Sequence, residues 1–369
     1  EAQALYAASE GWIAMIYLIF CVYAQTGAWR FDTKDMNALI EQVMFAPLGE
    51  RQRLFLLDIC MAEDFTAEQA AFVWQAPDAD ALLHDLTHNN AFITEGAPGV
   101  YRYHHMLRQL LRRKFALLPQ EQQAAACARL GSWYARTGEY LIAAELFRQA
   151  GDWDGLLRAA AADCGKSVGG EHRQMLLSWC RDCPEDVLRR HPDAVCVLMR
   201  KLFSFREIPE LLRLRALLLD ALQPGGAFCE QERENYLGEC DLVMSFLRYN
   251  DIAAMSVLHR SACKRMTRTT RCIDLGGTWT FMMFHRAAGQ LDAENAQMRD
   301  CMPFYYKVTD GHGSGAEHSM QCETDLLRGD FTEAEIGCHL ARDAALARGQ
   351  YSILLTAEFT ALRLVQLRG

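Results

Sequence analysis

The stretch LGSWYARTGEYLIAAELFRQA, residues 130–150, carries the clearest structural pattern in the chain. Small, large and turn-forming residues recur in it at the spacing of two antiparallel helices: Leu130, Gly131, Tyr134, Gly138, Tyr140, Ala143, Phe147 and Ala150. Small residues let two helices approach closely, and large residues fill the remaining gap. A glycine between the two patterns can end the first helix. We therefore predict a helical hairpin here.

This pattern is that of a tetratricopeptide repeat, and parts of it return farther along the chain. The second half recurs at Gly329, Phe331, Ala334, Cys338 and Ala341, and a weaker copy runs through Asn250, Ala254 and Leu258. The copies are not separated by whole multiples of about 34 residues, so the array is irregular. Stacked hairpins form a solenoid whose concave face suits binding. Residues 119–369 are therefore predicted to be a tetratricopeptide-like sensor domain.

Residues 47–118 have a different pattern. It begins with helical patterns at 51–62, at a helix start in 66–69, and around Leu82, Leu83 and Leu86. Two short β-like runs follow, 91–94 and 100–103, on either side of a Gly/Pro turn at 96–99. A basic helix at 104–115 comes last. A hairpin flanked by helices is typical of a winged helix. Residues 1–46 hold two more helical patterns and are predicted to be a helical domain. The expected fold is thus mainly α: a helical domain and winged helix followed by an irregular tetratricopeptide-like α-solenoid.

The basic helix at 104–115 includes Arg112 and Arg113, which raises the question of DNA binding. Its arginines are interleaved, however, with leucines and Phe115 at the spacing of a buried helix face. An amphipathic helix with a solvated basic face explains this pattern. DNA contact is therefore not expected from this helix.

Composition restricts the class of protein. The 369 residues suffice for two or three domains, and only nine are proline, which favours long helices. The net charge of −9 argues against a broad nucleic-acid-binding surface. Many of the 14 cysteines, such as Cys127 and Cys240, occupy apolar helix positions and are interpreted as reduced cytoplasmic thiols. The best candidate for a membrane span, 12–24, is shorter than the about 20 residues required, so no membrane association is expected.

The ends of the sequence also carry a prediction. The chain opens within a helix-like pattern, without an initiating methionine, and stops directly after the helical run 351–368. We interpret it as a portion of a longer protein, cut at domain boundaries.

Two motifs resemble catalytic sequences without their structural setting. Residues 165–167 (GKS) resemble the end of a phosphate-binding loop, but Ala160 stands where a glycine is required, and an alanine-rich helix precedes the motif. Cys180 and Cys183 have the spacing of a redox dithiol, but their surroundings are helical rather than βαβ. We therefore expect no nucleotide site at the first motif and interpret the second as the turn at the end of a helix, with two ordinary thiols.

The remaining polar residues give no enzyme signature. Asp310, His312 and His318 surround a glycine-rich loop, but their spacing matches no zinc pattern. Neither a Gly-x-Ser-x-Gly elbow nor a His-Glu-x-x-His pair is present in the sequence. No catalytic residue and no metal site are therefore predicted, and the chain is not expected to be an enzyme.

Several stretches resemble the MalT-like, LuxR-type transcriptional regulators of the STAND group of ATPases. They occur in the family's order: 9–12 (SEGW), 55–57, 82–86, 90–93, 101–107 (YRYHHML), 133–153, 278–286 and 302–317. The segment 101–107 is similar to the family's winged-helix signature, Tyr-His-x-Leu-Phe. The resemblance covers essentially the whole chain, is most specific in 90–153 and 278–317, and is weak in 155–275.

The resemblance implies a bacterial signal-transduction ATPase. In such proteins a P-loop domain binds ATP or ADP, the helical and winged-helix parts hold its closed state, and the repeat domain receives an inducer or a regulatory protein. A C-terminal helix-turn-helix then binds DNA. This chain would lack both the ATPase and the helix-turn-helix, so no cofactor is expected in it. The full-length protein could self-associate in response to ligand.

Candidate binding residues also follow from the resemblance. In related switch ATPases a winged-helix histidine reaches the nucleotide phosphates, and the matching position is His104; its alternative role is packing between hairpin and helix. For the inducer we select an aromatic and polar cluster, because such clusters suit ligand clefts: Trp279, Phe304, Tyr305, Tyr306 and His312. The alternative for this cluster is packing between helices. The alternative function is a protein–protein scaffold without a small-molecule ligand.

Overall fold

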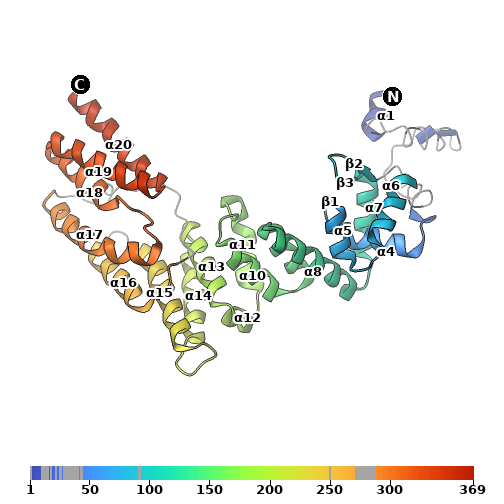
Figure 1. Ribbon diagram of the computed structural model, residues 1–369, viewed down its shortest axis with the longest axis horizontal. Helices are drawn as coiled ribbons and strands as arrows, with labels where there is room; N and C mark the ends of the chain where they lie inside the picture. The colour runs from blue at the N-terminus through green and yellow to red at the C-terminus, as the bar shows by residue number, and fades with distance from the viewer. Residues whose placement is uncertain are drawn as a thin grey trace. The chain divides into compact units, whose positions relative to one another are not determined.

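The computed structural model describes residues 2–9, 45–89, 93–248, 251–270 and 288–369, with single positions at 16, 19, 20, 23, 24, 27 and 41 (Figure 1). The chain divides into two compact units, Glu1–Leu156 and Leu157–Gly369. Helices dominate both units, which confirms the predicted mainly α fold. Most of the helical domain predicted at 1–46 lies outside the described residues, and its first helix is α1 (Ala2–Ser9). The domain boundaries predicted at 46/47 and 118/119 stay predictions.

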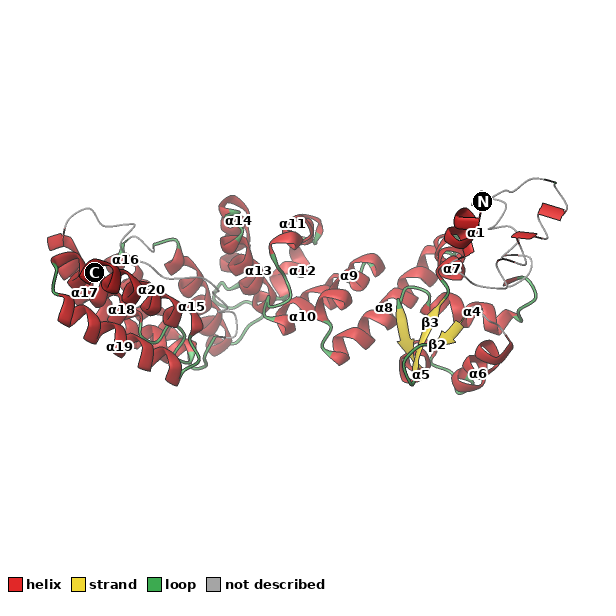
Figure 2. Cartoon of the chain, turned by 90° about the horizontal axis from the view of Figure 1, so that it is seen from above, coloured by secondary structure: helices red, strands yellow, loops and turns green. Residues whose placement is uncertain are grey.

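A three-stranded antiparallel sheet lies in the first unit (Figure 2). Its order is β1 (Asp64–Thr66), β3 (Val100–Tyr103) and β2 (Ile93–Glu95). The hairpin β2–β3 turns through Gly99, whose φ of 77° is the left-handed conformation that glycine adopts readily. This confirms the predicted hairpin. Strand β1 was not predicted; its last residue, Thr66, also accepts a hydrogen bond of 3.1 Å from the backbone N–H of Gln69 and so caps the next helix.

Four helices surround this sheet: α4 (Glu50–Ile59), α5 (Ala67–Trp74), α6 (Ala79–Asn89) and α7 (His105–Ala116). Their apolar faces share one core with the strands, in which Phe65 is 1 % exposed, stacks on the Tyr101 ring and contacts the tilted Tyr103 ring. The helices and the hairpin together form the predicted winged helix. On α7, Leu107, Leu110, Leu111 and Phe115 are buried. The amphipathic interpretation of this basic helix is thus confirmed.

The predicted helical hairpin of residues 130–150 is formed by α8 (Gln120–Thr137) and α9 (Tyr140–Ala150). Gly138 ends α8 with a φ of 89°, in the left-handed conformation. A Cβ added at Gly131 would lie 3.2 Å from the Phe147 ring, so glycine lets α9 approach α8 closely. The next helix, α10 (Trp153–Asp163), spans the boundary between the two units.

Helix α8 also packs against α4 and α5 of the winged helix. Arg129 on α8 donates to the carbonyl oxygen of Val73 at 2.8 Å and to the Asp58 carboxylate at 2.7 Å. Both charged side chains are about one-quarter exposed. Burial raises the pKa of Asp58, and the Arg129 guanidinium opposes that rise. Arg129 therefore links the first repeat helix to two helices of the winged helix.

Replacing Arg129 by methionine is expected to lower the free energy of unfolding by about 1–3 kcal/mol, because Asp58 and the Val73 carbonyl both lose their donor. Asp58→Asn is the matched control, because it removes the charge but keeps the side-chain shape. Urea titrations of the two single variants and the double variant measure the coupling. Additive losses in the double variant would show that the two side chains do not interact.

The second unit continues with paired helices: α11 (Arg173–Asp182), α12 (Glu185–Arg190), α13 (Pro192–Ser204), α14 (Ile208–Ala221), α15 (Glu230–Phe246), α16 (Ile252–Arg265), α17 (Ala288–Thr309), α18 (Ala316–Arg328), α19 (Phe331–Ala347) and α20 (Tyr351–Arg368). From α15 to α20 each helix packs against the next, α13 packs against both α14 and α15, and α18, α19 and α20 lie side by side (Figure 1). Gly329 joins α18 to α19 with a φ of 83°, and Ala334 and Ala341 are buried, as the second copy of the repeat predicts. None of the helices in the described part of the chain is long and apolar enough to cross a membrane.

Candidate functional site

A polar cavity lies among helices of the second unit. One face of helix α15 lines it, through residues at the i, i+3, i+4, i+7 spacing: Glu232, Asn235, Tyr236 and Glu239. Helix α13 faces them with Asp193, Cys196 and Val197, and the lining is completed by Ala161 of α10 and by Arg268. The cavity volume is about 380 Å³. This lies within the range of about 300–1,000 Å³ found for small-molecule sites.

An ion pair between one buried and one exposed side chain forms one part of the cavity. The Glu239 side chain is 4 % exposed, and its carboxylate lies 3.5 Å from the guanidinium of Arg268. The hydroxyl of Thr270 also donates to Glu239. Burial raises the pKa of Glu239, while the hydroxyl and the guanidinium both oppose the rise. The pair therefore joins a buried carboxylate to a guanidinium whose side chain is 42 % exposed.

An aromatic ring and two exposed acids form another part. The guanidinium of Arg268 lies 5.6 Å from the centre of the Tyr236 ring, within the range of a cation–π contact. Asp193 and Glu232 are exposed, unlike Glu239. Burial raises the pKa of Tyr236, and the nearby Asp193 carboxylate adds to this rise. The cavity thus combines three carboxylates, one guanidinium and an aromatic face.

The segment that carries Arg268 is held in place by backbone contacts. The N–H of Thr267 donates to the side-chain oxygen of Asn235 at 2.9 Å. The N–H of Thr270 donates to the carbonyl oxygen of Val308 on α17 at 2.8 Å. Because Asn235 is itself buried, this segment is fixed against α15 on one side and against α17 on the other.

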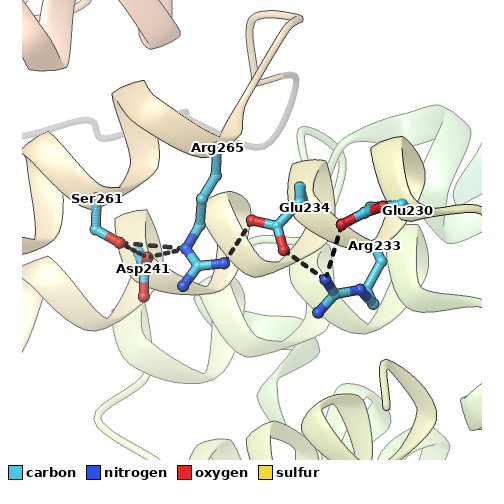
Figure 3. Close-up of polar contacts among 6 residues, drawn as sticks. All are labelled: Glu230, Arg233, Glu234, Asp241, Ser261 and Arg265. Atoms are coloured by element: carbon cyan, nitrogen blue, oxygen red, sulfur yellow. Dashed lines mark hydrogen bonds and ion pairs between the residues drawn. The ribbon is translucent and has the colours of Figure 1, made fainter. Parts of the chain in front are cut away.

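A chain of polar contacts aligns α15 with α16 next to the cavity face (Figure 3). Arg265 of α16 lies 2.5 Å from Glu234 and 3.5 Å from Asp241, and Ser261 donates to Asp241 at 2.7 Å. Arg233 pairs with Glu234 at 2.9 Å. Arg233, Glu234 and Asp241 occupy other positions of α15 than the residues that line the cavity. Their contacts therefore support the cavity wall without entering it.

The predicted aromatic cluster lies elsewhere in this unit, at the end of α17 and the turn that follows. Tyr305 is 1 % exposed, and its hydroxyl is 2.8 Å from Nδ1 of His312. Tyr306 donates to Glu317 and to the Gly313 carbonyl oxygen. Phe304 lies beneath the Arg260 guanidinium, at 4.4 Å. Trp279 lies outside the described residues.

These contacts bring Tyr305 and His312 together but use both groups in packing α17 against its following turn. The cavity of the second unit is lined by other residues. Ligand binding by the predicted cluster stays a prediction. Sequence reasoning missed the cavity itself, although the polar i, i+3, i+4, i+7 face of α15 is visible in the sequence. The sequence does not show that α13 and Arg268 lie opposite this face of α15.

His104 stands at the junction of β3 and α7. Its ring nitrogen Nδ1 accepts a hydrogen bond of 3.4 Å from the Met106 N–H, and its ring lies 4.5 Å from that of His105. His104 thus caps α7 and lies between the hairpin and the helix. This is the packing role given above as the alternative to a phosphate contact. The predicted contact with nucleotide phosphates stays a prediction.

The motifs that resembled catalytic sequences lie at helix ends. Residues 165–167 follow α10, and the backbone N–H of Ser167 donates to Asp163 at 2.9 Å. Cys180 lies within α11, and burial raises the pKa of its thiol to about 12, which is the opposite of an activated redox cysteine. Among the described residues, no group of three or more His, Cys, Asp or Glu side chains could hold a metal ion.

A second cavity, of about 750 Å³, lies in the winged helix between α6 and the sheet. It is larger, but the two histidines in its lining interact with each other: His88 stacks on His84 at 3.9 Å and its Nδ1 lies 3.0 Å from the His84 carbonyl oxygen. We therefore take the smaller cavity, with its ion pair and aromatic face, as the candidate site.

Comparison with known proteins identifies one part of the chain. Residues 40–125 match the family model of the MalT winged helix domain. The match includes α4 to α7 and the whole three-stranded sheet. Searches of curated proteins and of solved structures found no match. The chain therefore carries a winged helix domain of the MalT type, which supports a MalT-like regulator.

Proposed function

We propose that this chain is the regulatory and sensor portion of a cytoplasmic, LuxR-type member of the STAND ATPases. In this proposal the second unit binds a small-molecule inducer in the cavity between α13 and α15. The ATPase switch and the DNA-binding module belong to other parts of the full-length protein. The single observation that carries the proposal is a polar, partly aromatic cavity in helical repeats that follow a MalT-type winged helix.

The cavity lining favours a ligand with a positively charged group. Three carboxylates face one guanidinium, so the site keeps an excess of negative charge. The face of the Tyr236 ring, already in contact with Arg268, attracts cations through its quadrupole. An organic amine or guanidinium compound could compete with Arg268 for Glu239 and for this ring. An anionic ligand would meet the exposed Asp193 and Glu232 first and be repelled.

Helix α10 offers a route from the cavity to the winged helix. Ala161, near its end, lines the cavity. Gly155, near its start, packs against the Phe147 ring of α9, where an added Cβ would lie 2.7 Å from that ring. In the proposal, α10 can take two positions, and the ligand binds the cavity more tightly when α10 is in one of them. Binding then moves α10 to that position, and α9 and α8, which pack next to it, move as well. The ligand can shift this equilibrium only by its difference in affinity for the two positions.

We expect agmatine, used as a probe with one guanidinium and one amine, to bind the purified chain. Tyr236→Leu should weaken its binding about tenfold, because the cation loses the aromatic face. Asp193→Asn should weaken it about threefold, since an exposed charge contributes less. Isothermal titration calorimetry measures both effects, and the glutarate dianion should not bind.

Glu333→Gln, an exposed acid at the start of α19, is the matched control and should leave agmatine binding unchanged. Equal affinity of wild type, Tyr236→Leu and Asp193→Asn for agmatine would place binding outside the cavity. Tighter binding of glutarate than of agmatine would contradict the proposed ligand class.

A protein-interaction scaffold is the second candidate, favoured by the exposed apolar face of α20. Leu355, Phe359, Leu362 and Val365 on this helix are each at least half exposed. Exposed apolar stripes of this kind often mark protein contacts. If the chain is a scaffold, Leu362→Glu should abolish self-association in sedimentation experiments, and the cavity variants should change nothing.

A further inference from the structure

Two cysteines meet across the hairpin of α18 and α19. Cys322 on α18 is fully buried and Cys338 on α19 is 7 % exposed. Their sulfur atoms are 3.1 Å apart. The close approach depends on Gly337, where an added Cβ would lie 2.8 Å from the Cβ of Cys322. The two thiols are thus in contact because the neighbouring residue has no side chain.

The two sulfur atoms have different environments. Either thiol can donate in the contact between the two sulfur atoms, and the hydrogen bond with Cys322 lowers the pKa of Cys338. Burial and the nearby Glu358 and Glu335 carboxylates oppose this lowering, and the Arg342 guanidinium, one helical turn farther along α19, adds to it. The same contact and burial raise the pKa of Cys322. Cys338 is also the more exposed of the two residues, so a small reagent reaches its sulfur first.

We propose that Cys322 and Cys338 form a reversible dithiol–disulfide site that covalently joins α18 to α19 when a peroxide is present. This inference is independent of the ligand cavity. A disulfide has an S–S bond of about 2.05 Å, so the sulfur atoms need to move together by about 1 Å.

The chemistry balances with hydrogen peroxide as the oxidant. The Cys338 thiolate attacks one peroxide oxygen, the O–O bond breaks, and the leaving hydroxide takes up a proton to form water. Cys338 is now a sulfenic acid. The sulfur of Cys322 then attacks the sulfur of Cys338, the S–O bond breaks, and the departing hydroxide takes the Cys322 proton as a second water. Two electrons have passed from the thiols to the peroxide, and a dithiol reductant returns them.

Other buried cysteines lack this arrangement. Burial raises the pKa of Cys180 and of Cys60 to about 12 and that of Cys127 to about 11. Thiols of this kind are weak nucleophiles. Oxidation should therefore be selective for the α18–α19 pair among these buried thiols.

Peptide mapping by mass spectrometry tests the proposal. The folded, purified chain is treated with hydrogen peroxide, the peroxide is removed, free thiols are blocked with N-ethylmaleimide in guanidinium chloride, and the protein is digested. We expect a peptide pair joined through Cys322 and Cys338 that is two hydrogens lighter than the two peptides and that separates in dithiothreitol. Oxidation should also raise the melting temperature by about 5 °C, since the bond closes a loop of about 15 residues.

Three variants make the result specific. Cys322→Ser should leave a dimedone-reactive sulfenic acid on Cys338, whereas Cys338→Ser should give neither this product nor a disulfide. Cys180→Ser is the control and should keep the link. Circular dichroism under reducing conditions checks the folding of each variant. Unchanged N-ethylmaleimide labelling of Cys322 and Cys338 after peroxide treatment of folded wild type would overturn the proposal, as would a link to a different cysteine.

Discussion

Phe147→Ala should lower the free energy of unfolding of this protein by about 3–5 kcal/mol, the usual cost of removing a buried phenylalanine ring. The side chain is 6 % exposed and lies between two glycines on neighbouring helices. Cβ atoms added at Gly131 and Gly155 would lie 3.2 and 2.7 Å from its ring. The ring therefore fills the space where α8, α9 and the start of α10 meet, and alanine would leave a cavity there.

Urea unfolding measures this loss, and Ile142→Ala is its matched control. Ile142 lies on the same helix but is 46 % exposed, so its loss should be within about 0.5 kcal/mol. Equal losses for the two variants would show that the helices do not pack around Phe147.

Acid should destabilise the second unit through His259. Burial lowers the pKa of His259 from its ordinary 6.5 to about 4. Between pH 6.5 and about pH 4, the unfolded state therefore binds a proton at His259 that the folded state does not bind. This contribution to stability is complete above pH 6.5 and is lost as the pH falls to about 4. The loss amounts to about 3 kcal/mol, because one unit of pKa corresponds to about 1.4 kcal/mol.

The surroundings of His259 explain this shift. Its Nε2 is 3.1 Å from the hydroxyl of Ser245, and its ring lies 4.6 Å from that of Tyr305, with no acid among these contacts. His259→Gln keeps a polar group and cannot titrate, so this part of the pH dependence should disappear. His339→Gln, on the exposed face of α19, should behave like wild type. Urea midpoints between pH 4 and 7 test this, and parallel curves for wild type and His259→Gln would contradict it.

The fold could be predicted where one residue determines local geometry. Gly138 ends α8, and the turn at 96–99 closes the hairpin β2–β3, so both features are visible in the sequence. Strand β1 was missed because it has only three residues and its last one, Thr66, also starts a helix. Its pairing with β3 is a contact between distant segments, which local patterns do not contain.

The candidate site was harder to predict for the same reason. Aromatic residues at 304–306 suggested a cleft, but Tyr305 is in the core, where the sequence does not distinguish a packed ring from a ligand contact. The cavity residues come from α10, α13, α15 and the segment after α16, and each looks like an ordinary polar helix position. Glu239 becomes distinctive only when Arg268 is seen beside it.

The central claim is tested most directly by transcription from a reporter controlled by the longer regulator to which we propose that this chain belongs. Strains carry wild type, Tyr236→Leu or the control Glu333→Gln, at equal protein levels, and receive the inducing metabolite found by fractionation of cell extracts. The account predicts that Tyr236→Leu raises the inducer concentration for half-maximal transcription about tenfold, while Glu333→Gln does not change it. An identical induction curve for all three proteins would contradict the assignment of the α13–α15 cavity as the sensor site.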